Sequence, residues 1–200
     1  IQHILIDDWA QNIALTTELK QSFAKTAVLK SAVASEEKKE VGKKFRDYFE
    51  FSENLNKLPS HRLLAMLRGR QENVLGLKVD GQDDLPLTRI ETEYDLESVQ
   101  PQSRQDFLKQ TAKLFWLGKT RPAIEHSLLT EKRLAAETEA MDVFAENLRH
   151  LLLSAPAGAR TTLGVDPGIR TGVKLAVVNA SGDVLAHSTI YPFAPKEDKA

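Results

Sequence analysis

Leu163-Gly-Val-Asp-Pro-Gly-Ile-Arg-Thr-Gly172 is the stretch of sequence that decides the fold. It begins as an apolar strand, reaches an acid at Asp166 and then meets a Pro-Gly pair, which is typical of a turn. Two more β-rich runs follow, Val173–Val178 and Val184–Tyr191, with a Ser-Gly-Asp turn between them. Because such short connections join only antiparallel neighbours, the three runs predict a β-meander.

Asp166 is the candidate for a chemical role in this stretch. A carboxylate fixed at the end of a strand suits a hard cation such as Mg²⁺, and paired Mg²⁺ ions serve phosphoryl transfer. Gly168 and Gly172 would admit a close backbone or phosphate, and Arg170 and Lys174 flank the turn where phosphates could be met. One carboxylate does not make a metal site, however, and spacing alone favours Asp166 as the cap of a turn.

Working back toward the N-terminus, the pattern predicts a mostly helical region up to about residue 155. Apolar residues spaced three and four apart indicate a helix from Ile4 to Phe23, and a second helix is expected over Glu36–Phe49. A third runs over Leu58–Gly69, with Ser60 as its N-cap and the glycine as its stop. Residues 73–79 read as a short strand, and the acidic stretch 80–97 reads as a solvent-facing connection.

Helices are then expected to resume. A capping-box-like Ser103-Arg-Gln-Asp106 starts one helix, Gly118 ends it, and the longest helix is expected from about Thr130 to Leu153. The predicted fold class is therefore α+β, with three parts. A helical, helix-turn-helix-like core region with a short β element near 73–95 covers 1–127, a long connecting helix and linker cover 128–157, and the start of an RNase H-like domain covers 158–200.

A basic segment between residues 57 and 78 is the candidate nucleic-acid contact. It contains His61 and one acid, Glu72, and its bases are Lys57, Arg62, Arg68, Arg70 and Lys78. Phosphate contact is one interpretation, because nucleic-acid affinity comes mainly from such bases. The other is a capped helix with solvated charges, since cations at a helix C-terminus also favour the dipole.

Composition narrows the function classes. The net charge is -1, from 27 Lys and Arg against 28 Asp and Glu, so a nucleic-acid surface would have to be local. There are no cysteines, which excludes disulfides, thiolate zinc and Cys nucleophiles and fits a reducing, cytoplasmic setting. No apolar run approaches the roughly 20 residues that cross a bilayer, so no membrane partner is expected. The first residue is not Met, and we interpret the chain as an interior piece of a longer protein.

Several motifs together resemble one family. The string Leu163–Val178 resembles the resolvase-like (YqgF, RNase H-like) domain of bacterial Tex proteins, as does Thr189-Ile-Tyr-Pro192. Phe45-Arg-Asp-Tyr-Phe49, Pro59-Ser-His-Arg62 and Ala155-Pro-Ala-Gly158 resemble the same family in order and spacing. The resemblance implies a transcription accessory protein that binds nucleic acid, with further helical domains and an RNA-binding domain elsewhere in the polypeptide.

The resemblance also places Asp166 at the first acidic position of an RNase H-like site. In Tex-type proteins that acidic set is regarded as incomplete, which implies a nuclease fold kept as a scaffold, with Asp166 a weak or vestigial metal ligand and no cofactor required. The main hypothesis is thus a non-enzymatic factor that binds RNA or DNA without sequence preference, with RNA polymerase as a further partner. The alternatives are an Mg²⁺-dependent nuclease or resolvase, and a protein-interaction scaffold on the transcription or translation machinery.

Overall fold

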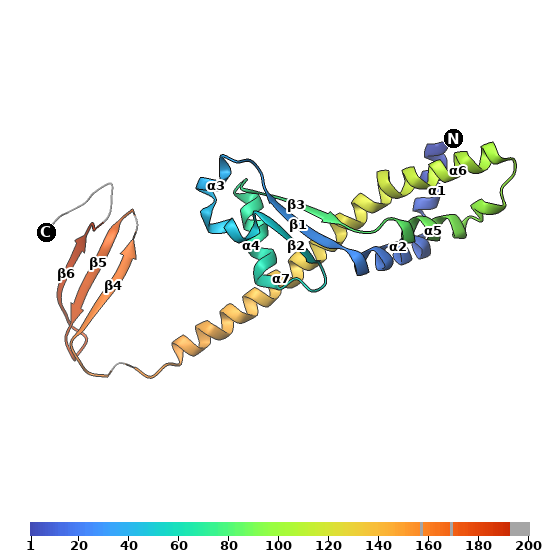
Figure 1. Ribbon diagram of the computed structural model, residues 1–200. Helices are drawn as coiled ribbons and strands as arrows, with labels where there is room; N and C mark the ends of the chain where they lie inside the picture. Colours follow the sequence, from blue (N-terminus) through green and yellow to red (C-terminus); the bar gives the residue numbers. More distant parts are fainter. Residues whose placement is uncertain (157, 169, 193–200) are drawn as a thin grey trace. The chain divides into compact units, whose positions relative to one another are not determined.

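The computed structural model describes residues 1–156, 158–168 and 170–192, and the chain divides into two compact units, 1–146 and 147–200 (Figure 1). Each unit is described by itself. The α+β prediction is confirmed, with helices dominating the first unit and strands the second. No helix among the described residues is long and apolar enough to cross a membrane.

Helices from two separate stretches of the first unit form a bundle with an aromatic core. Its members are α1 (Gln2–Ala10), α2 (Ile13–Thr26), α5 (Asp84–Glu93), the short η2 (Leu96–Ser98) and α6 (Gln102–Leu114). α1 and α5 pack against α6, and α5 also packs against α2. Trp9 stacks on Tyr94 with ring centroids 4.5 Å apart, and it meets Phe115 edge to face. Aromatic pairs of this kind add stability beyond the area that they bury.

The single helix predicted over the first residues is in fact two. α1 ends at Ala10, and Asn12 caps α2, because its side-chain oxygen accepts a hydrogen bond from the Leu15 amide at 3.0 Å. Ile4 and Ile13 consequently face solvent. The acidic stretch is also more ordered than expected, since it folds as α5 and buries Ile90.

A three-stranded antiparallel sheet of order β2-β1-β3 occupies the middle of this unit. Its strands are β1 (Val28–Val33), β2 (Glu50–Asn54) and β3 (Leu75–Asp80). The short helices α3 (Lys38–Val41) and η1 (Lys43–Tyr48) stand where one helix was predicted, and α4 (Ser60–Gln71) packs on β3. Of the strands only β3 was predicted. β1 alternates buried Leu29 and Ser31 with exposed Lys30 and Ala32, a period of two that the surrounding helical pattern obscured.

The limits of α4 differ from the prediction. Ser60 is the first helical residue and Pro59 takes the cap position. Gly69 lies inside the helix, where a Cβ would stand 2.5 Å from Leu75 Cδ1, so this glycine serves close packing rather than a helix end. The residue that adopts a left-handed backbone conformation after α4 is Asn73, with a φ of 56°. Along the chain α4 lies between two strands, so neither of its sequence neighbours is a second helix.

The helix predicted to stop at Gly118 continues. α6 passes through one π-helical turn, η3 (Phe115–Thr120), directly into α7 (Arg121–Leu152) (Figure 1). Phe115 and Trp116 in this turn are both fully buried. The long helix carries an apolar stripe that is largely exposed. Its members are Leu134, Met141, Phe144, Leu148, Leu151 and Leu152.

Arg121 joins the sheet and the bundle at the end of the π turn. Its guanidinium contacts Asp83 at 2.6 Å, Glu125 at 2.7 Å and Asp80 at 3.1 Å. It also lies over the Phe23 ring, 5.5 Å from the centroid. The Trp116 indole donates a hydrogen bond to Asp83 at 2.8 Å. Asp80 at the end of β3 and Asp83 before α5 are therefore both bound by side chains of η3 and α7.

The second unit contains the predicted meander. β4 (Thr162–Gly168), β5 (Gly172–Val178) and β6 (Val184–Ile190) form a sheet in that order, with both pairs antiparallel (Figure 1). Pro167 and Gly168, predicted as a turn, belong to β4, opposite Val173 and Gly172. A proline is tolerated there because β4 is an edge strand among the described residues.

Candidate nucleic-acid interface

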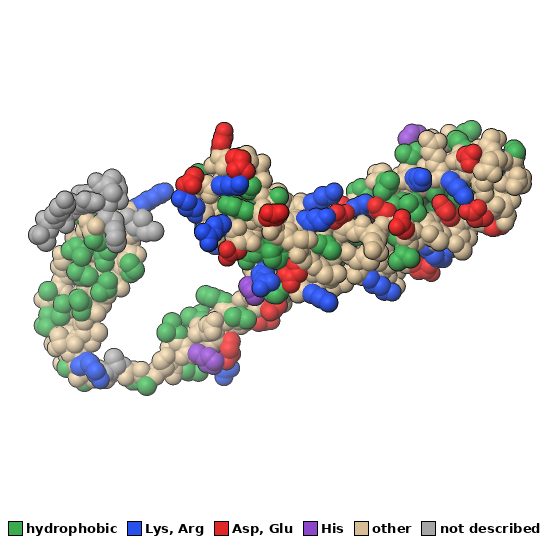
Figure 2. All heavy atoms as spheres, in the orientation of Figure 1, with side chains coloured by type: hydrophobic (Ala, Val, Ile, Leu, Met, Phe, Trp, Pro, Cys, Tyr) green, Lys and Arg blue, Asp and Glu red, His purple; other side chains and the backbone are tan. Residues whose placement is uncertain are grey.

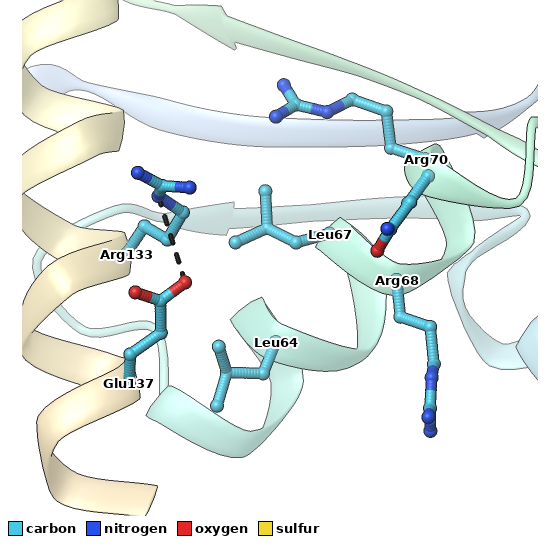
Figure 3. A pocket seen from close by; sticks show the side chains of 7 residues that line it. Leu64, Leu67, Arg68, Arg70, Arg133 and Glu137 are labelled. Carbon is cyan, nitrogen blue, oxygen red and sulfur yellow. Dashed lines mark ion pairs between the residues drawn. The ribbon is translucent and has the colours of Figure 1, made fainter.

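A groove of about 530 Å³ runs between α4 and α7. Arg68 and Arg70 come from the last turn of α4, and Arg133 comes from the facing side of α7 (Figure 3). The half-buried Leu64 and Leu67 provide its apolar surface, as Figure 3 shows. Gln71 and Glu137 complete the lining. Three arginines and one glutamate are therefore among the residues that line the groove.

These three arginines keep their hydrogen-bonding capacity. Arg133 Nε lies 3.9 Å from Glu137 Oε1 and Arg68 Nε lies 3.9 Å from Glu72 Oε1, both beyond hydrogen-bonding distance. Glu72 is instead held by Lys44 at 2.7 Å. For Arg70, the described part of the chain provides no ion pair or hydrogen bond to the guanidinium. Arginine side chains with unused donors are suited to bidentate binding of phosphate oxygens.

Two hydrogen bonds link α7 to α4 and to the turn before it. Ser60 donates to Glu139 at 2.5 Å, and the Lys132 ammonium donates to the Asn56 carbonyl at 3.2 Å. Ala136 of α7 is buried, as are Leu63 and Met66 of α4. The small side chain of Ala136 suits the close approach of a neighbouring helix. The arginines are thus carried by elements that these hydrogen bonds link.

The structure separates the other predicted bases from this groove. Arg62 is engaged by Glu53, with Nη1 and Oε2 3.1 Å apart. Lys57 lies exposed in the turn between β2 and α4, and Lys78 lies on the exposed face of the sheet. Of the basic segment, only Arg68 and Arg70 line the groove.

Arg133 is the residue that sequence reasoning missed. It stands in a charged run on a long helix, which is indistinguishable from an ordinary solvated helix face. Its role depends on the packing of α7 beside α4, and Arg133 lies more than sixty residues from Arg68 and Arg70 in the chain. The local pattern carries no signal for that contact.

Asp166 and its neighbours lie on one face of the meander. Asp166 pairs in register with Lys174 on β5, and Lys174 pairs with Thr189 on β6. Arg170 is exposed in the connection between β4 and β5. Within residues 1–156, 158–168 and 170–192, no three His, Asp or Glu side chains gather in a way that could hold a metal ion.

The glycines of the β4–β5 connection have a structural explanation. Gly172 has a φ of +81°, and a Cβ there would stand 2.8 Å from both Thr189 Cγ2 and Tyr191 Cε1. A Cβ on Gly168 would stand 2.6 Å from the Gly172 carbonyl oxygen. The close approach predicted at these positions is therefore made by the chain itself.

Comparison with known proteins gives matches along almost the whole chain. Residues 1–144 match the family model described as Tex central region-like, and residues 160–200 match the Tex protein YqgF-like domain. Protein tex of Bordetella pertussis is 40% identical over 98% of this chain and 26% of its own length. Transcriptional accessory protein Tex of Neisseria gonorrhoeae is 40% identical over 94% of the chain and 25% of its own length.

A human relative extends the comparison beyond bacteria. The S1 RNA-binding domain-containing protein 1 of Homo sapiens is 29% identical over 96% of the chain and 20% of its own length. The chain thus spans about a quarter of the length of the bacterial relatives that it matches.

Proposed function

Because the chain belongs to the Tex family, we propose that it is part of a transcription accessory factor that binds nucleic acid, and that the groove between α4 and α7 contacts the phosphate backbone. The observation that carries the proposal is the set of three arginines with unused donors, Arg68, Arg70 and Arg133. Phosphate contacts provide most of the affinity for nucleic acid without reading its sequence. Binding at this groove is therefore sequence-independent.

The names of the relatives support the same function. One relative is a transcriptional accessory protein, and another contains an S1 RNA-binding domain. We propose further that the chain works as a scaffold rather than as a nuclease, with RNA polymerase as the protein partner to test first. The test is whether immobilised full-length protein retains purified RNA polymerase when nuclease is present. Retention would support RNA polymerase as a partner.

The groove is tested by neutralising its arginines in the full-length protein. The triple variant Arg68→Gln, Arg70→Gln, Arg133→Gln is compared with the unaltered protein by fluorescence anisotropy on labelled RNA and DNA at several KCl concentrations. We expect weaker binding to every sequence, and a salt slope smaller by about one for each phosphate that the variant no longer binds.

Arg62→Gln is the matched control, since it removes one exposed arginine of the same helix that Glu53 already engages. It should leave affinity and salt slope close to those of the unaltered protein. A triple variant with unchanged affinity and slope would rule the groove out as a phosphate site.

A further inference from the structure

Asp166 belongs to a face of the meander that contains few charged groups. In the observed register the neighbouring rows on this face are Asp166–Lys174–Thr189 and Gly164–Ala176–His187. These six residues line a shallow concavity of about 540 Å³. Among the described residues lining it, Asp166 is the one carboxylate and Lys174 the one ammonium.

The lysine is placed by the backbone. Lys174 stands directly across from Asp166 in the antiparallel ladder, and side chains of such pairs project on the same side of the sheet. Its Nζ lies 3.7 Å from Asp166 Oδ2, which is an ion pair without a hydrogen bond. Both side chains are exposed, by 60% for Lys174 and 74% for Asp166, so ions in solution can reach the carboxylate.

This arrangement fits a divalent cation poorly. Mg²⁺ requires an octahedron of oxygen ligands and binds where carboxylate charge is in excess. Lys174 already balances the charge of the one carboxylate among the described lining residues, and an ion placed on its oxygens would also lie close to the ammonium. The repulsion between the two cations would oppose binding.

We propose that Lys174 is the resident counter-ion of Asp166, and that its ammonium keeps divalent cations off this face of the sheet. The carboxylate then serves to hold Lys174 rather than to bind metal. The proposal deepens the scaffold role given above, but it does not depend on the arginine groove. Its test can therefore fail or succeed independently of nucleic-acid affinity.

Mn²⁺ binding to the full-length protein tests the proposal, with the free Mn²⁺ signal followed by electron paramagnetic resonance. The unaltered protein, Asp166→Asn, Lys174→Met and the double variant are compared. We expect no Asp166-dependent binding in the unaltered protein. Lys174→Met should gain Asp166-dependent Mn²⁺ binding, because one nearby positive charge is lost, and the double variant should lose that gain.

Lys78→Met is the matched control, because it removes an exposed lysine from the other sheet. It should bind Mn²⁺ as the unaltered protein does, and circular dichroism should confirm that each variant is folded. Binding by the unaltered protein that Asp166→Asn abolishes would overturn the proposal. Lys174→Met binding that is no tighter than that of the unaltered protein would overturn it as well.

Discussion

At the scale of single residues, Arg121 stands at the centre of an ion cluster in the first unit. Its side chain is only 15% exposed and is surrounded by Asp80, Asp83 and Glu125. Removing one member of a largely buried ion cluster costs more than the pairs contribute, because the remaining charges stay desolvated and repel one another.

Arg121→Met should therefore lower the free energy of unfolding by about 2 kcal/mol, somewhat less than for a fully buried pair because the acids are partly exposed. Urea denaturation followed by tryptophan fluorescence measures the change. Arg89→Met is the comparison, since Arg89 pairs with Glu18 and Glu93 at the surface and its loss should matter much less. Equal effects of the two substitutions would refute a special role for Arg121.

Asp80 makes the stability of the same region depend on pH. The hydrogen bond from Lys30, with a further one from the Gly81 amide, lowers the pKa of the Asp80 carboxyl from 3.8 to about 2. Because the pKa is lower in the folded protein, the ionised carboxylate stabilises the fold above pH 3.8, and this contribution is lost as the pH falls toward about 2.

Asp80→Asn should accordingly weaken the fold at neutral pH and reduce the loss of stability between pH 3.8 and about 2. The measurement is the free energy of unfolding of both proteins across that range. Parallel pH curves for the two proteins would show that another carboxyl is responsible.

At the scale of secondary-structure elements, two helical glycines differ in what surrounds them. A Cβ on Gly69 would meet Leu75 side-chain atoms at 2.5 and 2.8 Å, whereas a Cβ on Gly118 would meet nothing within 4 Å. Gly69→Ala should destabilise the protein by about 1–3 kcal/mol through overpacking. Gly118→Ala should stabilise it by up to about 1 kcal/mol, because alanine is the better helix former.

Thermal unfolding of the two variants compares them directly. A shift in the same direction for both would mean that helix propensity, rather than packing, decides the outcome at Gly69.

The meander and most helices could be predicted from sequence because their signals are local. Pro167 and Gly168 fall at the end of β4, Ser181-Gly-Asp183 separates β5 from β6, and an alternating apolar pattern marks β3. The chain continues through Gly118 because Phe115 and Trp116 bury their rings in a π turn, which no local pattern of breakers indicates. β2 is short and polar, and it is a strand because β1 lies beside it.

At the scale of the whole molecule, the apolar stripe of α7 stands out because its side chains are exposed. Phe144 is 67% exposed, whereas Leu63 of α4 is 0% exposed. Phe144→Ser should therefore change the free energy of unfolding of the chain by no more than about 0.5 kcal/mol. Leu63→Ala should cost about 3 kcal/mol, because it leaves a cavity in the core.

Chemical denaturation of the 200-residue chain measures both changes. A loss for Phe144→Ser that matches the loss for Leu63→Ala would mean that the stripe is covered in solution. Hydrophobic side chains gather along this part of α7 and on the visible face of the second unit's sheet (Figure 2).

The candidate site was only half predictable for a reason that also belongs to this scale. Arg68 and Arg70 lie in a basic segment that can be read from the sequence, and they line the groove. Arg133 lies beside them because α7 lies beside α4. Arg62 does not line the groove and forms an ion pair with Glu53 of β2. Both outcomes depend on contacts between elements that the spacing of residues within each element does not encode.

The π turn between α6 and α7 has a consequence for the direction in which the long helix presents its side chains. One extra residue in a helix rotates everything after it by about 100°. The continuous helix can therefore present α6 to α1 and α5 and a different side, on α7, to α4, without a break in its backbone. The rotation at the π turn reorients the helix faces, a change that would otherwise require a loop between two separate helices.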